Sequence, residues 1–149
     1  MNQDKKQNID LGHRLSTNHF ELIELKIDDK TPVHAAFQIL MNCLLYLFYR
    51  KHFPTMAHNE ALLGAEVVDL KVVAPIEFYQ RLCLDCLERS LNLGIRAYCA
   101  GCDIAMSFSL ETLPDYWRHE DPHLKAVCII ASRQPLYRSN STALAIPNA

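Results

Sequence analysis

The chain has 149 residues, with 15 Lys and Arg against 17 Asp and Glu, so its formal net charge is -2. A composition of 50% hydrophobic and 21% charged residues excludes a disordered chain and predicts one globular domain. We expect an α+β domain over residues 15–138, with flexible tails at 1–14 and 139–149. The sequence has no basic cluster, so we do not expect nucleic acid as a partner. The polar N-terminus lacks an apolar signal core, so we expect a cytoplasmic protein.

The first half of the domain predicts a strand followed by a long helix. Residues 19–27 alternate in polarity as a strand does, and Asp28 and Asp29 end this segment. Thr31 then suits a helix cap and Pro32 the first helical position. The segment from 32 to 49 has no charged residue and is apolar nearly all round, as in a buried helix or a membrane span. Its uncharged part covers roughly 24–27 Å, short of a bilayer core, so we expect a buried helix and no membrane partner.

Three polar residues interrupt this helix at regular intervals. His34, Gln38 and Asn42 lie four residues apart and therefore fall on one side of the helix. Polar side chains inside a buried helix need hydrogen-bond partners or line a cavity. The stripe is therefore a candidate ligand-binding site; the alternative is that neighbouring strands or a second subunit satisfy it.

The second half of the domain is less uniform. A β-branched run over 62–76 predicts a strand, and 104–111 alternates in polarity as one arm of a hairpin with 94–100. The segment 124–132 predicts a final strand. Between them, residues 80–92 fit either a helix or a strand, although their periodicity favours the helix.

The chain has six cysteines, and four of them have the spacing of a zinc site. Cys83, Cys86, Cys99 and Cys102 form a C-x2-C-x12-C-x2-C pattern. However, Cys83 and Cys86 fall inside a regular apolar segment rather than in a tight turn. We therefore predict reduced thiols, no bound metal and no cofactor, with a zinc site as the alternative.

The order of a strand, an acidic turn, a long buried helix and several later strands over 19–111 resembles the hotdog fold of acyl-thioester thioesterases and dehydratases. Ala74-Pro75 and Gly94 lie about where that pattern has a strand end and a glycine. The resemblance implies a curved antiparallel sheet wrapped around one long buried helix. It also implies a homodimer, because such proteins usually form their substrate tunnel between subunits.

The same resemblance implies a function. The ligand would be an acyl thioester, carried by coenzyme A or by an acyl carrier protein. The chain would bind it, and whether it also hydrolyses the thioester is left open. Asp28 and Asp29 would act as general base or nucleophile beside the amide groups that open the helix. His34, Gln38 and Asn42 would bind the substrate. The alternative is a non-enzymatic adaptor that buries a partner's helix, which the helical interpretation of 80–92 favours.

Overall fold

The computed structural model describes residues 10–26, 31–53, 55, 60–79, 84–114 and 126–136. Strands and helices alternate along this part of the chain. In chain order the elements are β1 (Leu11–Arg14), β2 (His19–Leu25), α1 (Pro32–His52), β3 (Val67–Ala74), the 3-10 helix η1 (Ile76–Tyr79), α3 (Leu84–Cys99), β4 (Ala105–Thr112), α4 (Ala126–Ser132) and β5 (Gln134–Pro135). The prediction of a mixed α+β domain with one long helix is confirmed.

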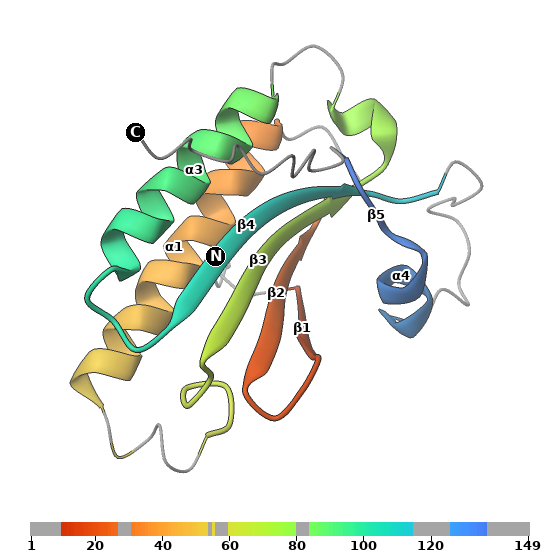
Figure 1. The fold of residues 1–149 in the computed structure, drawn as a ribbon. Helices are drawn as coiled ribbons and strands as arrows, with labels where there is room; N and C mark the ends of the chain where they lie inside the picture. The colour runs from red at the N-terminus through yellow and green to blue at the C-terminus, as the bar shows by residue number, and fades with distance from the viewer. Residues whose placement is uncertain are drawn as a thin grey trace, which may run out of the picture.

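The sheet has the order β1-β2-β3-β4-β5, and its central strands are parallel. β2 pairs with β3 and β3 with β4 in parallel register, whereas β1 and β5 add antiparallel edges. Helical crossovers explain the parallel pairing, since a helix carries the chain back so that the next strand begins at the same end of the sheet. α1 and α3 lie side by side over one face of the sheet, and α4 lies over the other (Figure 1). The expectation of an antiparallel sheet was therefore wrong, and the expected wrapping of a sheet around one helix is not seen.

α1 begins as the sequence predicts and packs on the sheet along one side. Thr31 caps it, because its Oγ1 accepts a hydrogen bond from the backbone N–H of His34 at 3.2 Å. The inner side of α1 joins the main core with the sheet residues Leu22, Leu70 and Phe108. The outer side is exposed, with Leu44 46% and Phe37 62% accessible. The prediction that this helix is buried all round was therefore wrong.

α3 confirms the helical interpretation for residues 84–92 and continues the helix to Cys99, while residues 80–83 lie outside the described residues. Gly94, which suggested a strand in the sequence, lies inside this helix, so the predicted arm at 94–100 was wrong and only β4 formed. Asn92 and Glu88 bind the free edge of β4. The Asn92 amide donates to Phe108 O at 2.8 Å and accepts from Phe108 N at 2.9 Å, while Glu88 Oε2 accepts from Leu110 N at 2.8 Å. These side chains satisfy backbone groups that an edge strand would otherwise expose.

Two terminal segments differ from the prediction. Residues 11–14, expected in the flexible tail, form β1 and pair with β2. Residues 126–132, expected in a final strand, form α4. A short apolar run satisfies either periodicity, so the sequence pattern could not separate helix from strand there. Residues 1–9 and 137–149 lie outside the described residues.

Arg50 joins the end of α1 to the segments that lead into β3 and β4. Its Nη1 donates to Leu63 O at 2.9 Å and to Ala65 O at 2.5 Å, and its Nη2 donates to Asp103 O at 2.8 Å. Three backbone carbonyls from two separate loops thus converge on one guanidinium group, which fixes the starting points of both strands relative to α1.

Candidate functional site

Glu24 and Lys26 bring two charges into the interior where β2 ends. The alternation of β2 turns Glu24 to the same side as Phe20 and Leu22, which are core residues beneath the helices. Glu24 is fully buried and Lys26 is 6% accessible, and the Lys26 ammonium forms an ion pair with Oε1 of Glu24. Buried charges are costly unless they are paired, so their retention at one strand end marks a candidate functional site.

Gln38 connects this ion pair to the helix. Its Oε1 accepts a hydrogen bond from Lys26 Nζ at 3.1 Å, although the two residues come from different elements. Lys26 N also donates to Val73 O at 3.0 Å, which holds the end of β2 against β3. The ammonium group is therefore held by a carboxylate on one side and an amide oxygen on the other.

Asp10 adds a second carboxylate at the same strand end. Its Oδ2 accepts a hydrogen bond from Leu25 N at 2.9 Å, so its side chain lies beside the backbone between Glu24 and Lys26. Asp10 directly precedes β1, whose first residue Leu11 pairs with Ile23, so Asp10 lies near the end of β2. Asp10 itself is exposed to solvent. We call Asp10, Glu24, Lys26 and Gln38 the strand-end cluster.

The strand-end cluster has more acid than base. It contains two carboxylates and one ammonium group, and its fourth member is a neutral amide. Mg²⁺ is usually held by one or two carboxylates together with water and substrate phosphates, so two acids suffice for it. In the described part of the chain, no three His, Cys, Asp or Glu side chains gather as a cation site. A cation held here would therefore need most of its ligands from water or from a substrate.

The residues predicted from sequence as a site divide into three environments. Asp28 and Asp29 lie outside the described residues. His34 is exposed, Gln38 belongs to the strand-end cluster, and Asn42 is buried with 6% accessibility. The Nδ2 group of Asn42 has no hydrogen-bond partner among the described residues. The three residues of the stripe therefore lie in one row on the helix, but of these three only Gln38 has a recorded hydrogen bond from its side chain to a charged group.

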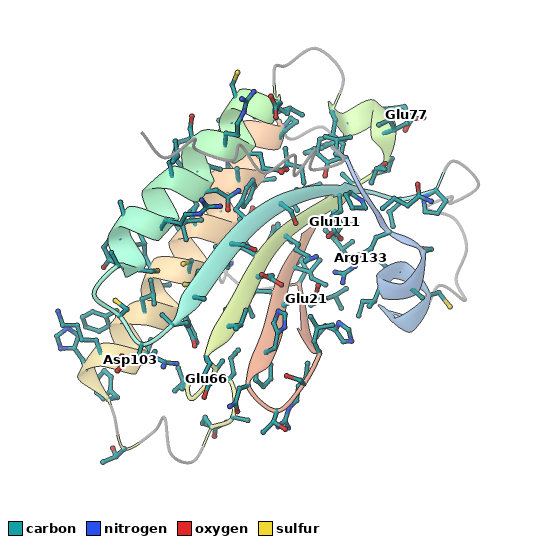
Figure 2. All side chains as sticks on the ribbon, in the orientation of Figure 1. Glu21, Glu66, Glu77, Asp103, Glu111 and Arg133 are labelled. Carbon is teal, nitrogen blue, oxygen red and sulfur yellow. The ribbon has the colours of Figure 1, made fainter. Side chains whose placement is uncertain are left out.

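The opposite face of the sheet carries a second set of charges, which we call the open-face network. It consists of His13, Glu21, Lys71, Glu111 and Arg133. Arg133 Nη2 lies 2.5 Å from Glu21 Oε2, and its Nε lies 3.1 Å from Glu111 Oε2. Lys71 Nζ lies 3.0 Å from Glu21 Oε1 and 2.5 Å from Glu111 Oε1. Figure 2 shows Glu21, Glu111 and Arg133 grouped where α4 covers the sheet.

The open-face network stabilises the ionised form of Glu21. Burial alone would raise the pKa of this carboxyl group, but hydrogen bonds from Arg133, His13 and Lys71 outweigh it and lower the pKa to about 2. Burial likewise opposes the charge of Lys71, yet Glu111 and Glu21 raise its pKa above the ordinary value. Two carboxylates face two cations and one histidine, so this network is balanced by its own members.

Three residues next to the network look like the parts of a nucleophilic triad, but they are connected in the wrong order. His19 Nε2 lies 2.8 Å from Asp69 Oδ2, and Ser107 Oγ donates to Asp69 Oδ1 at 2.6 Å. In a serine nucleophile the histidine must contact the hydroxyl in order to take its proton. Here Asp69 stands between the two groups, so the arrangement does not activate Ser107.

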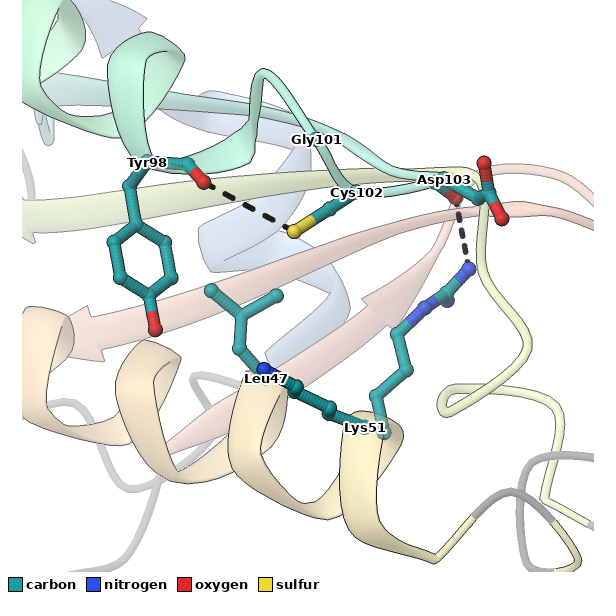
Figure 3. Close-up of a pocket in the computed structure, with 7 residues that line it drawn as sticks. Leu47, Lys51, Tyr98, Gly101, Cys102 and Asp103 are labelled. Atoms are coloured by element: carbon teal, nitrogen blue, oxygen red, sulfur yellow. Dashed lines mark hydrogen bonds between the residues drawn. The ribbon is translucent and has the colours of Figure 1, made fainter.

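A cavity of about 530 Å³ lies at the other end of α1, near the start of β4. Figure 3 shows Lys51 and Leu47 of α1 across from Tyr98 of α3, with Cys102 and Asp103 on the turn that follows α3. Its basic groups include Arg50, which is already hydrogen-bonded to Asp103 O. This cavity is therefore separate from the strand-end cluster and shares none of its residues.

The described cysteines do not gather as the zinc alternative requires. Cys83 lies outside the described residues, Cys86 and Cys102 are exposed, and Cys99 is partly buried. Cys43 is buried in the core, where burial raises its pKa to about 12. Among the cysteines that the structure describes there is no disulfide.

Comparison with protein-family models, with curated proteins and with solved structures finds no match to this chain. Within the described residues α1 alone is long and apolar enough to cross a membrane, judged by length and composition. Its inner side packs on the sheet, as the core helix of a globular domain does.

Sequence reasoning missed Asp10, Glu24 and Lys26. Asp10 fell in a segment assigned to the tail, and Glu24 was counted among the polar positions of an alternating strand. A usable signal was nevertheless present, because Glu24 shares the parity of Phe20 and Leu22 and therefore had to face the core. A charged residue on the apolar side of a strand, followed two residues later by Lys, predicts a buried ion pair.

Proposed function

We propose that the chain is a Mg²⁺-dependent phosphodiester hydrolase that acts on a nucleic acid strand. The observation that carries the proposal is the convergence of Asp10, Glu24 and Lys26 at the end of β2. Carboxylates that hold Mg²⁺, with a cationic group beside them, are suited to phosphate esters because both the cation and the ammonium neutralise phosphate charge. The exposed position of Asp10 suits an extended polymer better than a ligand that must be enclosed.

In this proposal the carboxylates of Asp10 and Glu24 would hold the cation together with water. The bound ion would supply a water of lowered pKa as the nucleophile and would neutralise phosphate charge. Hydrolysis would break the P–O bond to the leaving sugar, whose oxygen would take a proton from solvent. The products are a phosphomonoester and an alcohol, so one water is consumed for each bond broken.

Lys26 and Gln38 have distinct roles in this site. The Lys26 ammonium would turn from Glu24 to the phosphoryl oxygens, where negative charge accumulates in the transition state. Gln38, which accepts a hydrogen bond from Lys26 at 3.1 Å, would hold that ammonium in place. The proposal needs the cation because the two carboxylates alone would repel a polyanion.

The test is cleavage of plasmid DNA and of labelled single-stranded DNA and RNA, with Mg²⁺ or Mn²⁺ and with EDTA. We expect cleavage that needs the cation and that Asp10→Asn slows about a thousandfold. Asp103→Asn is the matched control, because it makes the same change at an exposed aspartate near the far end of α1. The proposal would be overturned if the wild type shows no cleavage and calorimetry shows no binding of Mg²⁺.

The thioester function predicted from sequence remains a prediction. It rests on Asp28 and Asp29, outside the described residues, while the side chain of Gln38 contacts Lys26. Assays with short, long and aromatic acyl-CoA substrates separate the two functions. Cation-independent hydrolysis of a thioester that persists in Asp10→Asn would favour the thioesterase over the phosphodiesterase.

A further inference from the structure

The outer side of α1 is an apolar surface that no described residue covers. Its members are half exposed, at 62% for Phe37, 46% for Met41, 46% for Leu44, 45% for Leu45, 52% for Phe48 and 46% for Tyr49. We call these six residues the outer apolar face. Isolated exposed hydrophobic residues are normal, whereas a continuous apolar patch of this kind marks an interaction surface.

The outer apolar face has the spacing of a helix–helix contact. Phe37, Met41, Leu44 and Phe48 follow one another at intervals of four, three and four residues, which places them in one row on the helix. No Asp, Glu, Lys or Arg occurs from residue 32 to residue 49. Burial of this row therefore desolvates no charged side chain, which removes the main cost of burying a helix surface.

A matching groove lies immediately beside this row. A cavity of about 240 Å³ runs between α1 and α3 and is almost entirely apolar. Its lining includes Leu40, Leu44 and Leu47 from α1 and Leu91 and Tyr98 from α3. Leu44 belongs both to the exposed row and to the wall of the groove, so the ridge and the groove are adjacent parts of one surface.

We propose that a second copy of this chain binds the outer apolar face, in a twofold dimer. In a twofold contact the same patch meets itself, so the ridge of each copy enters the groove of the other. A surface that offers a ridge and a groove side by side is suited to this geometry, with the axis close to Leu44. α1 of one subunit then lies against α1 of its partner.

The exposed area agrees with what a dimer needs. Half-exposed large side chains contribute on the order of 100 Å² each, so the outer apolar face with Tyr98 exposes on the order of 700 Å². A stable interface buries about 800 Å² per partner, including its polar rim. None of the six residues of the outer apolar face belongs to the strand-end cluster, so the dimer proposal does not depend on the proposed function.

The first experiment measures the mass of the full chain in solution by sedimentation over a wide concentration range. We expect a dimer, and we expect Leu44→Lys to raise its Kd about thirtyfold or more, as loss of a central interface residue does. Leu93→Lys is the matched control, since Leu93 is 67% exposed on α3 and lies outside the groove. If Leu44→Lys melts early, Met41→Lys replaces it, because Met41 is equally exposed.

The second experiment locates the axis. Under mild oxidation the Leu44→Cys variant should form a disulfide between the two subunits at position 44. Mass spectrometry would identify it as a linked peptide. The Leu93→Cys variant should form no such link at position 93. A monomeric wild type would overturn the proposal. The outer apolar face would then be left for another occupant, such as residues 137–149 of the same chain or a phosphatidylcholine vesicle. A dimer that Leu44→Lys and Met41→Lys leave intact would overturn it as well.

Discussion

The two faces of the sheet each carry a cluster of charged side chains, and the two clusters differ in how far they reach the surface. The open-face network sets Glu21 and Glu111 against Lys71 and Arg133, and each carboxylate contacts both cations. The strand-end cluster joins the buried Glu24–Lys26 ion pair to the exposed carboxylate of Asp10. A buried network whose charges pair internally needs no ligand, whereas an exposed carboxylate beside a buried ion pair can reach a bound cation. We therefore expect the open-face network to act on stability and the strand-end cluster to act on the proposed function.

The sharpest test of this difference is catalytic. Asp10→Asn should lower the rate of phosphodiester cleavage by about a thousandfold, since it removes a cation ligand. The exposed side chain of Asp10 makes the same change nearly neutral for stability. Glu21→Gln should leave the rate of the folded fraction unchanged. Cleavage rates at saturating Mg²⁺, corrected for folded fraction, measure both variants, and equal losses would show that the faces do not differ in role.

The reverse pattern is expected for stability. Glu21→Gln leaves Arg133 and Lys71 with one carboxylate between them, and breaking a buried ion pair in this way costs about 3–5 kcal/mol. Urea unfolding followed by circular dichroism measures the change. Glu66→Gln, at an exposed glutamate just before β3, is the matched control and should change the free energy of unfolding by less than about 0.5 kcal/mol.

Acid should weaken the open-face network through Glu21. Its pKa falls from 4.5 in the unfolded chain to about 2 in the fold, so its stabilisation is complete above pH 4.5 and is lost as pH falls through 2. The difference between the two pKa values corresponds to about 3 kcal/mol in the free energy of unfolding. Unfolding free energies measured between pH 5 and pH 2 should fall more steeply for the wild type than for Glu21→Gln; parallel curves would contradict the assignment.

The smallest expected effect is stabilisation by the cation. Mg²⁺ well above its Kd should raise the melting temperature by a few degrees, since a ligand that binds only the folded state stabilises it. Asp10→Asn should lose this shift and Asp103→Asn should keep it. Differential scanning fluorimetry with MgCl₂, and with NaCl at equal ionic strength, measures the difference. A shift that NaCl reproduces would indicate screening rather than binding.

Local patterns in the sequence predicted individual elements better than their arrangement. Thr31 and Pro32 marked the start of α1, and the periodicity of 80–92 identified α3. The periodicity of a strand does not say whether its neighbours run parallel or antiparallel. The antiparallel pairing was taken from the hotdog resemblance, and it was wrong for the central strands. Once 80–92 is taken as a helix, the order strand-helix-strand-helix-strand favours parallel pairing, as the structure has it.

The candidate site was only partly predictable, for a physical reason. Gln38 was identified because a polar residue stands out on an apolar helix. Asp10 could not be connected to it, because their proximity depends on the antiparallel pairing of β1 with β2. Such a contact is fixed by register, which one sequence specifies weakly when the strand is only four residues long.

The guanidinium group of Arg50 has a consequence for how this chain could vary in length. Because Arg50 ties α1 directly to Leu63, Ala65 and Asp103, the starting points of β3 and β4 do not depend on the connection after Phe53 to hold them. Closing a longer loop costs little entropy when its ends are anchored. Insertions between Phe53 and Glu60, and even new chain termini there, should be tolerated as long as Arg50 is retained.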